Sequence, residues 1–167
     1  VLLAAFPFLA KRGVAWWEAR KVLEPWKARR PKQFDFNIIV IGAGSAGLVS
    51  AYIAAAVKAK VALIERHKMG GDCLNTGCVP SKALLRSAKV FAQSRRATEL
   101  GFRSIKVDAN FGDLMRRVKR VVSQVEPHDS VERYTSLGVD CLQGQAKIVS
   151  PWSVEVSTPE GTRTLTT

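Results

Sequence analysis

Hydrophobic and polar positions over residues 34–167 predict a strand, a helix and a second strand in succession. Residues Phe36–Ile41 form a short apolar run rich in β-branched side chains, which is typical of a parallel strand buried on both faces. Small and apolar residues predict a helix from Ser45 to about Lys58, and Lys60–Ile64 predicts the next strand. This order indicates an α/β fold built on a parallel sheet.

The remaining pattern predicts longer helices and then β-structure. Residues Ser81–Gly101 are expected to form one long helix, and Asn110–Leu137 a helical pair broken at Pro127, with Asp129 or Ser130 as the cap of its second member. The end of the chain alternates between strand-like runs and turns. The expected strands are Val139–Leu142, Ala146–Val149, Val154–Ser157 and Arg163–Thr166.

A glycine motif, G-x-G-x-x-G at residues 42–47, directly follows the first predicted strand. In such a turn Gly42 permits the tight bend, Gly44 lets a pyrophosphate approach the backbone, and Gly47 lets the helix pack closely on the strand. The free N–H groups at the helix start favour phosphate. Glu65 ends the second strand, where an acid is expected to bind the adenosine ribose. The alternative is a tight turn without a ligand.

A cysteine pair lies in the segment Gly70-Gly71-Asp72-Cys73-Leu74-Asn75-Thr76-Gly77-Cys78-Val79-Pro80-Ser81-Lys82. Cys78 is expected at a helix N-terminus, with Thr76 as a candidate cap. The helix dipole would then lower the pKa of the Cys78 thiol. Lys82 follows one helical turn later on the same face.

Other readings of the two cysteines have weaker support. Inert core thiols are the usual state of cysteine, and zinc sites bring further Cys or His at close spacing. The plant-type ferredoxin spacing needs a cysteine at position 81, which is Ser81. A structural disulfide is rare in the cytosol. The third cysteine, Cys141, is expected to be a small buried side chain.

The thirteen-residue segment after a dinucleotide-binding unit resembles the redox motif of the FAD-dependent pyridine nucleotide-disulfide oxidoreductases, which include dihydrolipoyl dehydrogenase, glutathione reductase and mercuric reductase. The resemblance implies that the unit binds FAD and that a later domain binds NAD(P)H. It makes Cys73 the interchange thiol that attacks substrate and Cys78 the charge-transfer thiol against the flavin. The family pattern often has Thr where this chain has Asp72, whose carboxylate would tend to raise the pKa of Cys73.

The same resemblance implies a cofactor site drawn from several segments of the chain, without metal. Its expected residues are Gly42, Gly44, Ser45, Ala46, Gly47, Glu65, Arg66, Gly70, Gly71, Asp72, Cys73, Cys78, Lys82 and Ala146. The fold expected is a Rossmann-type FAD-binding domain, with helices on both faces of a parallel sheet, plus a small β-meander.

Family members are far longer, so residues 34–167 are expected to be the truncated N-terminal part of the FAD domain of a homodimeric enzyme. Electrons would pass from NAD(P)H through FAD and the cysteine pair to a disulfide or an Hg(II)-like substrate. The alternatives are a dihydrolipoyl dehydrogenase that runs in the opposite direction, and a membrane-tethered nucleotide-binding module without catalysis.

Composition and charge add a separate feature at the N-terminus. The chain has 167 residues, 47% of them hydrophobic, which suits one packed domain, and its net charge is +12. Residues 1–10 are apolar and are expected to be the end of a transmembrane helix, while residues 11–33 are a basic, Trp-rich juxtamembrane linker. The arrangement resembles reductases fused to a DedA-like membrane domain, at the cytoplasmic face of a bacterial membrane. The alternative is a cytoplasmic protein in which the N-terminal segment is only a linker.

A nucleic-acid function, the other reading of a basic chain, has little support. One predicted helix has an apolar stripe and, opposite it, a basic cluster of Arg116, Arg117, Lys119 and Arg120. The cluster is therefore interpreted as the solvated face of that helix.

Overall fold

The computed structural model of the chain describes residues 13–14, 16–18 and 20–167. The predicted end of a transmembrane helix at residues 1–10 therefore lies outside the described residues. Described residues between 13 and 23 are helical and continue into the 3-10 helix η1 (Glu24–Arg29). In the described part of the chain, no helix has both the length and the apolar content needed to cross a bilayer.

A three-stranded parallel sheet forms the centre of the fold, in the order β1 (Ile38–Ile41), β2 (Val61–Glu65) and β3 (Val139–Gln143). Helix α2 (Ser45–Ala56) connects β1 to β2. The middle strand is almost wholly buried, since it has a neighbour on each edge and a packed layer on each face. The burial on both faces predicted for the first strand holds only in part, because β1 lies at the edge of the sheet, where Val40 is buried and Ile41 is exposed.

The first face of the sheet packs against α2 and the short helix α6 (Val131–Ser136). Val61 and Leu63 of β2 point to this face and meet side chains of both helices. The residues buried there are Val40, Ala43, Leu48, Ala51, Ala55, Val61, Leu63, Tyr134 and Val139. The alternation of side chains along a strand sends Ala62 and Ile64 to the opposite face.

The second face of the parallel sheet is covered by an antiparallel meander, β4 (Gln145–Ser150), β5 (Ser153–Thr158) and β6 (Gly161–Thr166). Its core joins Phe36, Ala62, Ile64, Val154, Val156 and Leu165. The expected meander is confirmed. Helices on both faces were also expected, but within the described residues helices cover one face and the meander the other, because β5 and β6 supply the apolar side chains that Ala62 and Ile64 need.

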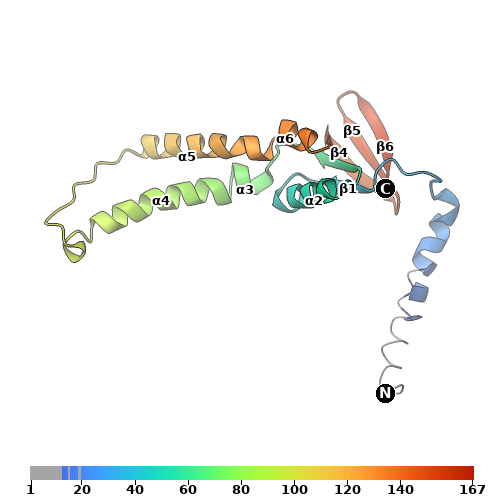
Figure 1. The fold of residues 1–167 in the computed structure, drawn as a ribbon, viewed down its shortest axis with the longest axis horizontal. Helices are drawn as coiled ribbons and strands as arrows, with labels where there is room; N and C mark the ends of the chain where they lie inside the picture. Colours follow the sequence, from blue (N-terminus) through green and yellow to red (C-terminus); the bar gives the residue numbers. More distant parts are fainter. Residues whose placement is uncertain (1–12, 15, 19) are drawn as a thin grey trace, which may run out of the picture.

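A long helical hairpin projects from the sheet (Figure 1). It consists of α3 (Gly71–Asn75), α4 (Cys78–Ser94) and, after the turn η2 (Thr98–Leu100), the returning helix α5 (Phe111–Val125). Helix α4 begins at Cys78, before the predicted start at Ser81, and ends at Ser94, before the predicted end at Gly101. The break expected at Pro127 is the 3-10 helix η3 (Glu126–Asp129).

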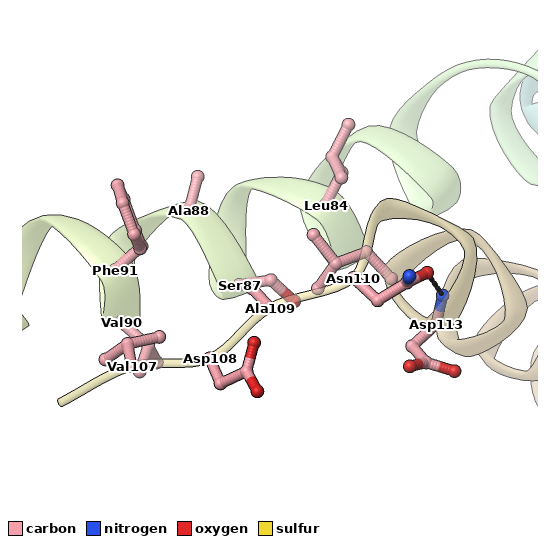
Figure 2. A pocket seen from close by; sticks show the side chains of 11 residues that line it. Leu84, Ser87, Ala88, Val90, Phe91, Val107, Asp108, Ala109, Asn110 and Asp113 are labelled. Carbon is pink, nitrogen blue, oxygen red and sulfur yellow. Dashed lines mark hydrogen bonds between the residues drawn. The ribbon is translucent and has the colours of Figure 1, made fainter.

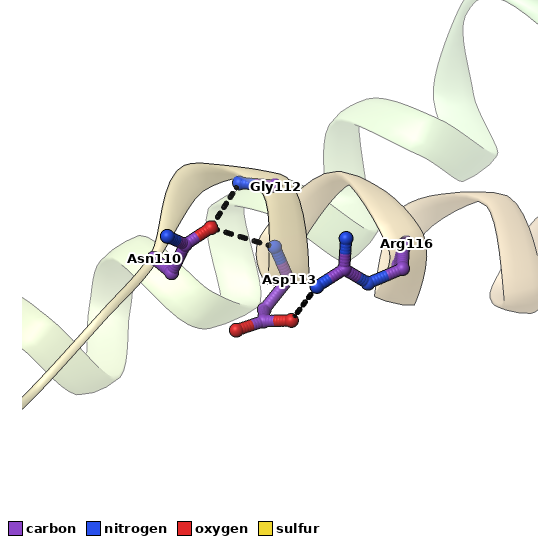
Figure 3. Close-up of polar contacts among 4 residues, drawn as sticks. All are labelled: Asn110, Gly112, Asp113 and Arg116. Atoms are coloured by element: carbon purple, nitrogen blue, oxygen red, sulfur yellow. Dashed lines mark hydrogen bonds and ion pairs between the residues drawn. The ribbon is translucent and has the colours of Figure 1, made fainter.

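Side-chain caps mark where α5 and α6 begin. The Asn110 side chain accepts hydrogen bonds from the N–H groups of Gly112 (2.8 Å) and Asp113 (3.3 Å), and Asp113 pairs with Arg116 (Figure 3). Ser130 accepts a bond from the Arg133 N–H at the start of α6, so Ser130 rather than Asp129 is the cap. The basic cluster on α5 is largely solvated as expected, but Arg117 donates to the Ala83 carbonyl of α4 at 2.7 Å.

Candidate active site

The glycine turn between β1 and α2 has the geometry that its sequence predicted. Gly42 has a φ of +94°, and its N–H donates to the Ile64 carbonyl at 2.7 Å. A Cβ atom at Gly47 would stand 1.8 Å from the Gly42 carbonyl oxygen, so only glycine allows α2 to start this close to β1. A Cβ at Gly44 would meet no atom of the described chain within 4 Å. The backbone at Gly44 therefore faces open space where a phosphate could approach.

The start of α2 offers donors to that space. Gly44 is the N-cap residue of α2. The N–H groups of Ser45, Ala46 and Gly47 lie in the first turn, where no helix carbonyl is available four residues earlier to accept their hydrogen bonds. The helix dipole adds partial positive charge at the same end. These features fit a diphosphate group.

The glycine turn is also joined to the loop that carries the cysteines. The Gly70 N–H donates to the Ala43 carbonyl at 2.9 Å. A Cβ at Gly71 would lie 2.8 Å from the Gly44 Cα, and Gly71 itself has a φ of +53°. The two loops are thus packed backbone to backbone, which places the cysteines beside the start of α2.

Cys73 lies in α3 and Cys78 is the first residue of α4. Both are free thiols, Cys73 half-buried and Cys78 exposed, and they are hydrogen-bonded to each other. The loop between them is tight, since the Gly77 N–H donates to the Asp72 carbonyl at 2.6 Å. This proximity is what a pair must have to form a disulfide and reopen it.

The two thiols differ in acidity. Hydrogen bonds from the Cys78 thiol, above all, and from the Ser45 hydroxyl lower the pKa of Cys73, and the Cys78 backbone N–H and the Lys82 charge act in the same direction. The same contact with Cys73 raises the pKa of Cys78, although the charge of Lys82 partly opposes it. The lowered pKa predicted for Cys78 is therefore wrong for the reduced pair, because the contact with Cys73 and the partial burial of the thiol outweigh the first N–H of α4, which does act to lower the pKa.

Two further expectations on this loop need correction. The Thr76 hydroxyl does not cap α4: it donates to the Asp72 carbonyl at 3.4 Å, and Gly77 is the N-cap residue. The pKa of Cys73 is lowered, not raised as Asp72 suggested, because the hydrogen-bond donors around the thiol outweigh its burial, and Asp72 is not among the groups that shift it.

Asn75 is a structural residue of the site that sequence reasoning missed. Its side-chain amide donates to the Met69 carbonyl (3.0 Å) and the Gly71 carbonyl (2.8 Å), which braces the turn before Cys73. The contact of Ser45 with Cys73 was missed as well. Asn is a frequent turn residue, which was the available signal for Asn75. Nothing in the local pattern indicates the Ser45 contact, since it joins two distant segments.

Glu65, at the end of β2, is hydrogen-bonded to the glycine turn. Its carboxylate accepts hydrogen bonds from the N–H groups of Ala43 (2.7 Å) and His67 (2.8 Å). Burial alone would raise the pKa of Glu65, but the backbone donors of His67, Ala43 and Arg66 together lower it. Glu65 is thus ionised at neutral pH, and each carboxylate oxygen retains a lone pair for a hydroxyl donor.

A hollow of about 230 Å³ lies beside Glu65, at the carboxyl ends of β1 and β2. Its lining is Ile41, Gly42, Ile64, Glu65, Arg66, Gly144, Gln145 and Ala146. The Gly144 N–H donates to the Glu65 carbonyl at 2.9 Å, which brings the start of β4 to this point. The predicted residues Glu65, Arg66 and Ala146 are therefore neighbours in space, at the strand ends where α/β folds bind ligands.

A separate apolar hollow of about 640 Å³ lies on the helical hairpin, between α4 and the segment that leads into α5 (Figure 2). Its lining includes Leu84, Phe91 and Val107. It contains none of the cysteine or glycine-turn residues. Within the described residues, no cluster of three metal-ligating side chains occurs.

The geometry places a glycine turn at a helix start beside a pair of free cysteines, and known proteins were compared with the chain. The family model described as pyridine nucleotide-disulphide oxidoreductase matches residues 36–163. The chain belongs to this family. The family match confirms the fold and the resemblance drawn from residues 42–47 and 70–82.

Several relatives show how the similarity is distributed. The chain is 36% identical over 118 residues to a dihydrolipoyl dehydrogenase of Bacillus subtilis (70% of this chain, 24% of that protein), and 33% identical over 124 residues to a mercuric reductase of Bacillus cereus (74% and 20%). Among solved structures it resembles the Cu(II) complex of the HOCl-induced flavoprotein disulfide reductase RclA from Escherichia coli, with a TM-score of 0.63 at 26% identity over 80% of this chain and 27% of that one. The chain thus spans about a quarter of the length of these relatives.

Proposed function

We propose that this chain is the flavin- and dithiol-bearing part of an oxidoreductase that passes electrons from NAD(P)H through FAD and the Cys73–Cys78 pair to a disulfide or a thiophilic substrate such as Hg(II). The observation that carries the proposal is the hydrogen-bonded thiol pair packed against the glycine turn. Support also comes from the family match over residues 36–163.

The residues around the turn fit FAD. The first N–H groups of α2 and the open backbone at Gly44 would hold the diphosphate, and Glu65 would accept the ribose hydroxyls. The hollow beside Ala146 would take the adenine. When bound, FAD supplies a carrier of two electrons beside the cysteines. The nicotinamide nucleotide is assigned to a part of the protein beyond this chain.

The dithiol chemistry follows from the acidities of the two thiols. The Cys73 thiolate attacks one sulfur of a substrate disulfide, a mixed disulfide forms, and the first substrate thiolate leaves. Cys78 then attacks the Cys73 sulfur as a thiolate, which closes the Cys73–Cys78 disulfide and releases the second substrate thiolate. Two electrons pass to the substrate, and the two protons of the protein thiols end on the two products.

Neighbouring groups promote the first of these steps. The Ser45 hydroxyl and the Cys78 N–H donate to the Cys73 thiolate, and the Lys82 charge favours it. The half-buried position of Cys73, next to an exposed Cys78, leaves a route for a substrate to approach. A soft divalent ion would instead be held between the two thiolates.

Two alternative functions can be distinguished from the proposed reductase. In a dihydrolipoyl dehydrogenase the same residues carry electrons the other way, from a dithiol substrate to NAD⁺. A nucleotide-binding module without catalysis would use the turn and Glu65 but not the cysteines. The substitution Cys73→Ser distinguishes an enzyme from a binding module. The full-length enzyme would lose turnover, whereas a binding module would keep both its flavin and its function.

The test is an anaerobic titration with dithionite of the protein purified with its flavin. We expect a long-wavelength absorption band at two-electron reduction, from the Cys78 thiolate against the flavin, and loss of that band in Cys78→Ser. Cys141→Ser serves as the matched control and keeps the band, because Cys141 lies on β3 outside the pair. A protein without flavin, or one whose band survives Cys78→Ser, would contradict the proposal.

A further inference from the structure

The described residues of segment 13–32, here called the basic aromatic segment, present tryptophan rings and positive charges together. Trp16 is 60% exposed and Trp17 is 55% exposed. The Arg20 guanidinium lies over the Trp16 ring, 4.1 Å from its centroid, and the Lys21 ammonium lies over the Trp17 ring at 3.7 Å. Rings and charges therefore occupy the same side of the helix.

The arrangement follows from helical spacing. Residues four positions apart lie one above the other, which pairs Trp16 with Arg20 and Trp17 with Lys21. Leu23, seven positions after Trp16, falls on the Trp16 face, whereas the acidic Glu18 lies about 200° from Trp16, at roughly 100° per residue. The acid is thus turned away from the face that carries Trp16, Arg20 and Leu23.

The segment does not use these side chains to pack on the domain. Within the described residues η1 buries none of its side chains, and Figure 1 shows the helical segment extending away from both sheets. Leu23, on the same face as Trp16, is also 38% exposed. Large apolar side chains held out in solvent on a helix indicate a binding surface.

The positive charge of the basic aromatic segment favours a partner with a negatively charged surface. The segment has six basic residues, Arg20, Lys21, Lys27, Arg29, Arg30 and Lys32, against the acids Glu18 and Glu24. Tryptophan beside lysine and arginine is the composition that prefers the boundary between lipid headgroups and acyl chains, because the ring is apolar and the charge can reach the headgroups. A nucleic-acid surface would use the charges of this face but not the apolar side chain of Leu23.

We propose that the basic aromatic segment docks on the surface of a bilayer that contains anionic lipid, with Trp16 and Trp17 inserted at the headgroup level and Arg20 and Lys21 on the lipid phosphates. Helices of this kind lie in the plane of the interface and gain from both the apolar area buried and the anionic charge. The docking does not require the redox pair, so it stands or falls separately from the proposed catalysis.

The test measures binding of the full chain to vesicles. Co-sedimentation with phosphatidylglycerol–phosphatidylcholine vesicles, together with a blue shift of tryptophan emission, is expected, with much weaker binding to pure phosphatidylcholine. Trp16→Ala with Trp17→Ala, or Arg20→Glu with Lys21→Glu, should lower the partition coefficient by about tenfold or more. Lys119→Glu with Arg120→Glu is the control for net charge, since both residues are exposed on α5 and should leave vesicle binding nearly unchanged.

Three results would overturn the proposal: no preference for anionic vesicles, equal losses from the α5 control, or binding to single-stranded DNA without binding to vesicles. Circular dichroism of each variant checks that the fold is intact, which is expected because the segment lies outside both cores. If FAD binding and the long-wavelength band persist in a variant that has lost vesicle binding, the two proposals are shown to be independent.

Discussion

Gly47 lies so close to Gly42 that a Cβ atom at Gly47 would stand 1.8 Å from the Gly42 carbonyl oxygen. This contact joins the first turn of α2 to the end of β1 and fixes the direction in which α2 leaves the sheet. The end of α2 that we propose binds phosphate and the packed core beneath it are therefore set by the same pair of glycines.

Gly47→Ala is expected to destabilise the fold by about 2 kcal/mol or more, because the new methyl group meets backbone that cannot move without shifting the helix. Urea unfolding of the purified chain measures the effect. Gly44→Ala is the matched control: its methyl group would enter open space, so stability should be nearly unchanged while FAD affinity falls. Equal stability losses at the two positions would contradict this account of the turn.

Cys73 should react with iodoacetamide before Cys78 at neutral pH. The pKa of Cys73 is lowered and that of Cys78 is raised, so the thiolate fraction of Cys73 is the larger and its rate–pH profile should lie at lower pH. Mass spectrometry of partially alkylated, reduced protein identifies the modified residue.

Cys78→Ala should raise the pKa of Cys73 and slow its alkylation at pH 7, since it removes the thiol donor that contributes most. Cys78→Ser keeps a hydroxyl donor at that position and should preserve more of the rate. Lys82→Gln should shift the profile in the same direction as Cys78→Ala, because the positive charge is lost. Preferential alkylation of Cys78 in the unmodified chain would show that the acidities are reversed.

Glu65→Gln should lower the free energy of unfolding at pH 7 by about 1 kcal/mol, because the amide cannot accept hydrogen bonds at both of its ends. The loss is this small because the carboxylate is only half-buried and solvent screens its charge. The pKa of Glu65 in the fold is below its ordinary value of 4.5, so its stabilising contribution is present above that value and lost as pH falls through the folded pKa. Thermal unfolding between neutral and acid pH should show this loss in the native chain and a flatter profile in Glu65→Gln.

Asn110→Ala should destabilise the hairpin by about 1 kcal/mol, because the two N–H groups capped by the Asn110 side chain lose their partner. Asn110→Asp is the control and should retain the cap. Hydrogen exchange of the first turn of α5 gives the local measure. Unchanged protection in Asn110→Ala would mean that contacts with α4 hold the helix start without the cap.

Local sequence was enough to predict most of the elements and the two motifs. Apolar runs over residues 36–41 and 60–64 located β1 and β2, and the glycine pattern predicted the turn because few other residues tolerate its backbone and contacts. The cysteine segment was recognised because its spacing and flanking glycines occur together. These features depend on side chains that are near one another along the chain.

Tertiary structure decided which distant groups meet. The Cys78 thiol lowers the pKa of Cys73 most, and the Ser45 hydroxyl, which α2 brings to the pair, adds to that effect. The meander rather than a helix covers Ala62 and Ile64, and Glu65 closes on Ala43 across the turn. Such contacts join segments far apart in the sequence, and their energies depend on distance and burial, which local pattern and propensity do not contain.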